Sequence, residues 1–277
     1  MNFVKMHGLG NDFILINAME EKIPGDLPYF AKKICDRRFG VGGDGVIFIL
    51  PSEKADLRMQ ILNSDGSEPE MCGNGIRCFA VLAYEKRLIN KPDLEVETLA
   101  GIIKPQIIFD ADGSIKGVKV DMGEPRLIPR EIPLNIPGER AINEVIQVNS
   151  KTFNYTAVSM GNPHCVIFVD DTDNTPVQEI GSLIEKHALF PKKTNVEFVE
   201  VINPKEVKMR VWERGAGETL ACGTGTCATV VACVLNKKTK REVKVHLLGG
   251  DLDIEWAADN HVFMSGPAVK VFEGIIF

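Results

Sequence analysis

The sequence has few histidines and no pair of cysteines spaced as Cys-x-x-C. Five histidines are scattered through 277 residues, and the seven cysteines are an odd number. Structural zinc sites need clustered Cys and His ligands, and disulfide frameworks are typical of short secreted chains with paired cysteines. We therefore expect no metal site, and reduced thiols.

Basic blocks and long apolar runs are also absent. The formal net charge is −6, and lysines and arginines do not cluster. Because nucleic-acid binding depends largely on clustered positive charge, no nucleic-acid partner is expected. No apolar stretch reaches the roughly 18 residues of a membrane-spanning helix, and the first residues lack the apolar core of a signal peptide. The sequence thus predicts no membrane association and a cytoplasmic location.

An internal repeat is the main feature that is present. At a shift of 150 residues, Cys72-Gly73-Asn74-Gly75 aligns without a gap on Cys222-Gly223-Thr224-Gly225. At a shift of 151 residues, Asn11 aligns on Asn162 and Asp44 on Asn195. Self-similarity at a fixed period indicates a duplicated structural unit.

Each half has the pattern of several strands and one apolar helix that follows the cysteine turn. In the first half, helices are expected at 29–38 and 75–86, with strands at 3–6, 13–16, 46–50, 57–63, 94–98, 102–109 and 118–121. In the second half, helices are expected at 177–187 and 223–235, with strands at 155–159, 165–169, 196–201, 208–212, 242–247, 252–256 and 261–264.

These elements predict an α+β fold with two similar domains related by a pseudo-twofold axis, each a mainly antiparallel β-sheet wrapped around a central helix. Gly-Pro segments at 122–125 and 264–267 are suited to the crossovers between the domains. We expect residues 1–121 to form one domain and 122–267 the other. The strand-like tail, 268–277, is expected to return to the first domain, with a ligand site in the cleft between the two.

Cys72 and Cys222 are the candidate reactive groups, because each lies in a glycine-flanked turn before a helix. Free N–H groups and the helix dipole favour an anion there, either a thiolate or a substrate carboxylate. Two thiols on opposite sides of a cleft suit inversion at a carbon, where a base removes a proton from one face and an acid supplies one to the other. His164 and Glu213 are candidates for tuning the thiol pKa values, and a structural role for His164 is equally consistent. The other cysteines are expected to be small buried residues: Cys35, Cys78, Cys165, Cys227 and Cys233.

Other patterns support no second site. Gly40-x-Gly42-x-x-Gly45 matches a dinucleotide fingerprint as a string, but a strand follows where a helix is required. The segment from Cys72 to Arg77 is one residue short of the phosphate-binding loop Cys-x5-Arg. The residues leave open a redox role for the two thiols, lysine-bound pyridoxal phosphate, and a non-catalytic ligand-binding protein.

Several stretches together resemble diaminopimelate epimerases nearly from end to end. They are Lys5-Met-His-Gly-Leu-Gly-Asn-Asp-Phe13, Asn63-x-Asp-Gly-Ser67, Cys72-Gly-Asn-Gly-x-Arg-Cys-Phe79, Ser159-Met-Gly-Asn-Pro-His-Cys-Val166, Glu213-Arg-Gly-Ala-Gly-Glu-Thr219 and Ala221-Cys-Gly-Thr-Gly225. The resemblance implies a cofactor-independent epimerase, an isomerase that interconverts LL- and meso-2,6-diaminopimelate for lysine and peptidoglycan synthesis. It also implies a homodimer and a small-molecule substrate.

The resemblance implies that Cys72 and Cys222 are the catalytic acid/base pair. It implies substrate binding by Asn11, Asn63, Gly73, Asn74, Asn162, Asn195, Glu213, Arg214, Gly223 and Thr224. Arg214 is suited to a distal carboxylate, because its guanidinium can bind one bidentately. Proline and hydroxyproline racemases, the nearest alternative, also use two cysteines in such turns, but their substrates would not need Arg214. Two positions depart from the family: Gly45 replaces a glutamine contact of some members, and Phe272 replaces a tyrosine that supports the dimer.

Overall fold

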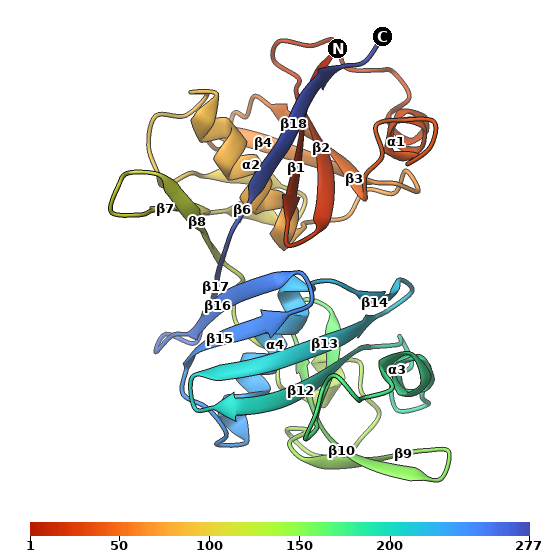
Figure 1. Ribbon diagram of the computed structural model, residues 1–277. Helices are drawn as coiled ribbons and strands as arrows, with labels where there is room; N and C mark the ends of the chain where they lie inside the picture. The colour runs from red at the N-terminus through yellow and green to blue at the C-terminus, as the bar shows by residue number, and fades with distance from the viewer. The chain divides into compact units, whose positions relative to one another are not determined.

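A computed structural model describes residues 1–277, and Figure 1 labels its helices and strands. The chain divides into unit 1, which is Met1–Asp121 with Ser265–Phe277, and unit 2, which is Met122–Met264. Both units combine mixed β-sheets with two α-helices, which confirms the predicted α+β class. No helix is long and apolar enough to cross a membrane.

In unit 1 the sheet has the strand order β18-β1-β2-β3-β4-β5-β6. The pairs β2/β3 and β4/β5 are parallel, and the other pairs are antiparallel. The C-terminal strand β18 pairs with β1, so both chain ends belong to unit 1 (Figure 1). The elements are β1 (Asn2–Gly8), β2 (Asn11–Asn17), α1 (Leu27–Cys35), β3 (Gly45–Leu50), β4 (Leu57–Asn63), α2 (Gly73–Glu85), β5 (Val96–Thr98), β6 (Gly101–Ile103), the hairpin β7 (Gln106–Phe109) and β8 (Ile115–Asp121), and β18 (Val269–Ile275).

Helices α1 and α2 pack on opposite faces of this sheet. Successive side chains of a strand point to opposite sides, so neighbouring residues of β3 contact different helices. Ile14, Val46 and Phe48 join the hydrophobic cluster that contains α1. Ile47 and Ile61 instead contact α2 at Gly75. Helix α2 is therefore the central helix of unit 1.

In unit 2 the strand order is β17-β16-β15-β13-β12-β11-β10-β9, and β14 pairs with β13. The pairs β11/β12 and β13/β15 are parallel, as are the corresponding pairs of unit 1. The elements are η1 (Pro129–Glu131), β9 (Glu144–Val148), β10 (Lys151–Ser159), β11 (Pro163–Phe168), α3 (Val177–Glu185), β12 (Asn195–Asn203), β13 (Glu206–Glu213), β14 (Gly217–Thr219), α4 (Gly223–Leu235), β15 (Glu242–Leu247), β16 (Gly250–Trp256) and β17 (Val262–Gly266).

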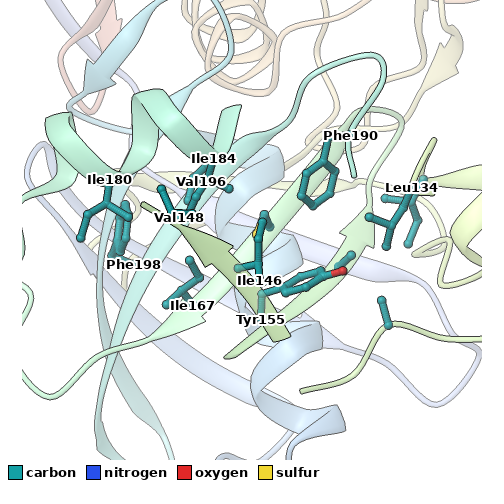
Figure 2. Close-up of a cluster of buried hydrophobic side chains, with 14 of the residues drawn as sticks. Leu134, Ile146, Val148, Tyr155, Ile167, Ile180, Ile184, Phe190, Val196 and Phe198 are labelled. Carbon is teal, nitrogen blue, oxygen red and sulfur yellow. The ribbon is translucent and has the colours of Figure 1, made fainter. Parts of the chain in front are cut away.

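The apolar cluster on the α3 side of this sheet is drawn in Figure 2. Ile180 and Ile184 of α3 pack there with Val196 and Phe198 of β12. Helix α4 contacts β10, β11, β12 and β16, and nine of its residues are buried. It is the central helix of unit 2, as α2 is of unit 1.

The strand register corrects one equivalence that the sequence alignment predicted. Phe13 pairs with Gly45 in unit 1, and His164 pairs with Asn195 in unit 2. Because Phe13 is the counterpart of His164, Gly45 is the counterpart of Asn195, and the alignment of Asp44 on that residue was wrong. The offset between the two copies changes from 151 to 150 residues before this point in the chain. The bounds of α1 and α3 already differ by 150 residues.

Element boundaries also differ from the prediction, for local reasons. Helix α1 begins at Leu27 because the side chain of Asp26 accepts a hydrogen bond from the Tyr29 N–H, and Pro28 fits the first turn. The strand expected at 102–109 is divided between β6 and β7, because Pro105 has no N–H for the ladder. Strands β9 and β14 were not predicted.

Candidate active site

Each central helix begins immediately after a cysteine, as the glycine-rich turns predicted. Cys72 is the N-cap of α2 and Cys222 is the N-cap of α4, both with extended backbone angles. The free N–H groups of Gly73-Asn74 and Gly223-Thr224 therefore lie in the first turns of the two helices. Such groups, together with the positive end of the helix dipole, can bind a carboxylate or stabilise a thiolate.

The Cys72 sulfur is partly exposed and lies among amide groups. It accepts a hydrogen bond from the Gly75 N–H, at 3.4 Å, and its S–H donates to the Asn11 Oδ1, at 3.8 Å. Asn11 is held from two sides, since its Oδ1 accepts from Asn74 Nδ2 at 3.1 Å and its Nδ2 donates to Asp44 at 2.7 Å. The Asn11 amide therefore presents its oxygen toward the thiol.

Arg77, which the sequence reasoning did not single out, supports this loop from within. It is fully buried and donates to the Gly73 carbonyl at 3.0 Å and to Asn74 Oδ1 at 2.9 Å. A side chain at Gly8 would approach its guanidinium to 2.9 Å. In the sequence, Arg77 could have been recognised as a charged residue within an apolar helical run. Asn63, another predicted site residue of unit 1, donates to Ser67 Oγ at 3.0 Å.

Cys222 is more enclosed than Cys72, with 5% of its surface exposed. Its sulfur is 3.6 Å from the Thr224 hydroxyl. Burial raises the pKa of the Cys222 thiol well above its ordinary value, and the carboxylates of Glu213 and Glu197 raise it further. Glu213 accepts a hydrogen bond from Thr219 at 2.5 Å, which fixes its side chain. These surroundings favour a protonated Cys222.

His164, Glu197 and Asn162 form a hydrogen-bonded chain in unit 2 that leads from the interior to the partly exposed Asn162. His164 Nδ1 lies 2.7 Å from Glu197 Oε1, and His164 Nε2 lies 3.0 Å from Asn162 Oδ1. His164 and Glu197 are both fully buried. Glu197 was not predicted as a site residue, although a lone acidic residue within the apolar strand 196–199 was a visible signal.

Asn195 and Arg214 are joined through the backbone. Asn195 accepts from the Arg214 N–H at 2.8 Å and donates to the Pro163 carbonyl at 3.0 Å. The exposed Arg214 guanidinium donates to the Lys192 carbonyl at 3.0 Å. Asn195 therefore fixes the start of the loop that carries Arg214, and one hydrogen and one lone pair of its amide remain for other partners.

The other five cysteines are buried and free, which confirms the prediction that they are small buried residues. Burial raises the pKa of Cys35 to about 11 and those of Cys78 and Cys233 to about 12. They are consequently unreactive near neutral pH. No group of three or more His, Cys, Asp or Glu side chains is arranged to hold a metal ion.

Solved structures with the same fold have different titles. The chain matches a phenazine biosynthesis protein of the PhzF family from Bacillus anthracis with a TM-score of 0.73 at 19% identity, covering 100% of this chain and 99% of that one. It matches a hydroxyproline epimerase from Agrobacterium vitis with a TM-score of 0.68 at 16% identity, covering 99% and 91%. These likenesses confirm the fold.

Sequence relatives are much closer. A diaminopimelate epimerase from Moorella thermoacetica is 60% identical over 275 residues, 99% of this chain and 98% of that protein. One from Heliobacterium modesticaldum is 60% identical over 277 residues, 99% of each. The family model described as diaminopimelate epimerase matches residues 3–128 and 156–271. The chain therefore belongs to the diaminopimelate epimerase family.

Proposed function

We propose that this protein interconverts LL- and meso-2,6-diaminopimelate without a cofactor, in the supply of lysine and peptidoglycan precursors. The observation that carries the proposal is the pair of cysteines: each caps the central helix of its unit in the same Cys-Gly-x-Gly turn. Membership of the diaminopimelate epimerase family and the names of the relatives support the substrate.

The chemistry is proton transfer at the α-carbon by two bases. A thiolate takes the α-proton from one face, and a thiol on the other face donates its proton, so the configuration inverts and the protonation states of the two sulfurs exchange. The environment of Cys222 supports its assignment as the thiol that donates in one direction. Cys72 is then proposed as the thiolate that removes the proton in that direction, where its sulfur accepts from the Gly75 N–H; in the protonated form its S–H donates to the Asn11 Oδ1.

The N–H groups of Gly73-Asn74 and Gly223-Thr224 are proposed to bind the α-carboxylate and to stabilise the charge that develops as the α-carbon loses its proton. The scheme requires both helix N-termini to meet the same carboxylate in the substrate complex. His164 and Glu213 are proposed to tune the thiols.

The distal end of the substrate carries a second ammonium and a second carboxylate. Arg214 is proposed to bind this carboxylate, because a guanidinium forms two parallel hydrogen bonds with one. Oxygen acceptors suited to the ammonium are proposed to come from Asn11, Asn63, Asn195 and Glu213. Asn162 is also proposed to contact the substrate. A substrate with one carboxylate would leave Arg214 without a partner.

Proton NMR of LL-diaminopimelate in deuterated water tests the proposal. The wild-type protein, with no cofactor added, should form the meso isomer with deuterium at the inverted α-carbon. Cys72→Ala and Cys222→Ala should each lower turnover by at least about a thousandfold, as expected when an essential acid or base is lost. Cys78→Ala and Cys227→Ala remove buried thiols of the same two helices and should retain activity. Full turnover in either Cys72→Ala or Cys222→Ala would refute the two-base scheme.

The alternative activity on hydroxyproline is favoured only by the fold shared with a hydroxyproline epimerase. The same experiment decides it, with trans-4-hydroxyproline as the substrate. Inversion of hydroxyproline without exchange into diaminopimelate would replace the proposed substrate.

We also propose that the protein is a cytoplasmic homodimer. Strand β18 is an outer strand of its sheet and exposes apolar side chains. Val269, Val271 and Phe272 are 45%, 54% and 46% exposed, respectively. An exposed apolar edge strand is a template for pairing with another chain, and a second copy of this strand is the partner proposed. Light scattering should give twice the monomer mass, and Val271→Lys should give the monomer.

A further inference from the structure

Two counterpart asparagines of the repeat have their amides turned in opposite directions. In unit 1, Asn11 donates its Nδ2 to Asp44, at 2.7 Å, and presents its Oδ1 toward Cys72. In unit 2, Asn162 places its Oδ1 3.0 Å from His164 Nε2, and its Nδ2 makes no hydrogen bond within the protein. One asparagine thus offers an acceptor and the other a donor.

Asp44 fixes the orientation of the Asn11 amide. A carboxylate only accepts hydrogen bonds, so the NH2 group of the amide must face it. The orientation of Asn162 depends on whether His164 Nε2 carries a hydrogen. If it does, Nε2 donates to Asn162 Oδ1; if it does not, the amide must rotate and donate its NH2 group to the ring. The proton content of His164 therefore decides which end of Asn162 is available.

Glu197 controls that proton content. Its Oε1 lies 2.7 Å from His164 Nδ1, and both side chains are fully buried. A net charge in such a place costs more than a neutral pair. The pair is neutral when it holds two protons, one between Oε1 and Nδ1 and one on Nε2, because the loss of either leaves a net charge of −1. Whether the proton between Oε1 and Nδ1 is on oxygen or nitrogen, Nε2 keeps its own hydrogen.

Two further observations support a proton held by Glu197. Its Oε2 is buried and has no hydrogen-bond partner, which is costly for an ionised carboxylate. Burial also raises the pKa of the Glu197 carboxyl, against the lowering effect of His164. The absence of a side chain at Gly225 leaves room for this carboxyl, since a Cβ there would lie 2.7 Å from Oε1.

We propose that Glu197 is a positioning residue of the active site. Through His164 it holds the Asn162 amide with its NH2 group directed away from the ring, as a hydrogen-bond donor for an anionic group of the substrate. Asp44 holds the Asn11 amide in the opposite orientation, with its Oδ1 available as an acceptor. The contact with substrate rests on the function proposed above, whereas the link from Glu197 to Asn162 does not.

The link is tested without substrate, by nitrogen NMR of protein labelled with 15N-histidine. There are five histidines, and a His164→Gln variant assigns the signals of His164. The wild-type protein at pH 7 should show hydrogen on Nε2 as the single state. Glu197→Gln keeps the size of the side chain but cannot share a proton with Nδ1, so the Nδ1 signal should move. Glu185→Gln, which changes a buried carboxyl bonded to Trp212 and Lys193, should leave His164 unchanged.

The consequence for catalysis is tested by a double-mutant cycle of Glu197→Leu and Asn162→Ala. Glu197→Leu alone should raise KM about tenfold with a smaller effect on kcat, the loss expected for one directed hydrogen bond to a charged group. In the Asn162→Ala background it should add less than about twofold. Thermal unfolding of each variant checks that it is folded, and Glu197→Gln takes the place of Glu197→Leu in the cycle if that variant does not fold.

Additive effects of the two substitutions, or unchanged His164 signals in Glu197→Gln, would overturn the proposal. If diaminopimelate is not a substrate and the NMR result is as expected, the proposed function fails and the link from Glu197 to Asn162 stands.

Discussion

The two copies of the cysteine turn share a backbone and differ in the side chains next to it. In the strand register Ile47 pairs with Leu15, and its counterpart Glu197 pairs with Val166. A Cβ at Gly75 would meet Ile47 at 3.1 Å, whereas one at Gly225 would meet Glu197 at 2.7 Å. Duplication has preserved the helix N-terminus and its cysteine. The strand residue next to the turn is apolar in unit 1 and ionisable in unit 2, whereas the buried Arg77 of α2 has Cys227 as its counterpart in α4.

This difference suits the proposed reaction, which needs one thiolate and one thiol at the same time. Burial and the carboxylate of Glu213 favour the protonated form of Cys222. In unit 1 the strand side chains nearest to Gly75 are Ile47 and Ile61, which carry no charge, and the buried charged group at the turn is the Arg77 guanidinium, a cation. A second difference lies in the loops: Glu213-Arg214 in unit 2 corresponds to Asn63-Ser64 in unit 1. The second carboxylate of the substrate is therefore proposed to bind in unit 2.

Among changes that test the difference between the two copies, replacing Arg214 by the residue of the other copy should have the largest effect. Arg214→Ser gives unit 2 the side chain that Ser64 provides in unit 1. We expect KM for diaminopimelate to rise about tenfold to a hundredfold, because a carboxylate loses charge-assisted hydrogen bonds. Steady-state kinetics measure it. Arg241→Ser is the control, since Arg241 stacks on Trp256 at 4.3 Å and should leave KM within about twofold. An unchanged KM in Arg214→Ser would remove this residue from the site.

The difference between the two cysteine turns can also be tested by protein stability, with substitutions at Gly75 and Gly225. Gly225→Ala places a methyl group 2.7 Å from the buried carboxyl of Glu197 and 3.2 Å from the Cys222 Sγ, whereas the nearest atoms to a methyl group at Gly75 are the ends of two isoleucine side chains, at 3.1 and 3.3 Å. We expect Gly225→Ala to lower the free energy of unfolding by about 1–3 kcal/mol, the range for overpacked sites. Gly75→Ala should lower it less. Both changes add the same group at the same helix position, so helix propensity cancels when their urea midpoints are compared. Equal losses would contradict the asymmetry.

The repeat made much of the site predictable from the sequence. Cys72 and Cys222 were recognisable because glycine-rich turns before helical patterns specify local backbone geometry. The helices and most of the strands followed from hydrophobic periodicity in the same way. The break between β6 and β7 was not predicted. Pro105 causes it by a local effect, but this proline lies within an apolar run that has the pattern of one continuous strand.

Arg77 and Glu197 show what could not be predicted. Their roles depend on burial and on partners far along the chain, such as Pro267 for Arg77 and His164 for Glu197. The equivalence of Gly45 and Asn195 likewise depends on strand register, which is set by pairing between segments rather than by either segment alone. Local pattern predicted the candidate reactive groups, and tertiary contacts determine how those groups are held.

The smallest expected effect concerns the reactivity of the two thiols. Only a thiolate reacts with iodoacetamide, and the raised pKa of Cys222 lowers its thiolate fraction at pH 8. Cys222 is also less exposed than Cys72. Cys72 should therefore be alkylated about tenfold faster at that pH, as followed by mass spectrometry of tryptic peptides. The peptide 215–237 also carries Cys227 and Cys233, which are buried and serve as unlabelled internal standards.

The pH dependence separates the two causes of slow labelling at Cys222. Restricted access lowers the rate by the same factor at every pH, whereas a raised pKa makes the rate continue to climb above the ordinary cysteine pKa of about 8.5. We expect the Cys222 rate to be still rising at pH 10, where a free cysteine peptide has levelled off. A Cys222 rate that levels off with the free peptide would assign its slow reaction to access alone. The carboxylates of unit 2 would then not be what distinguishes the two cysteines.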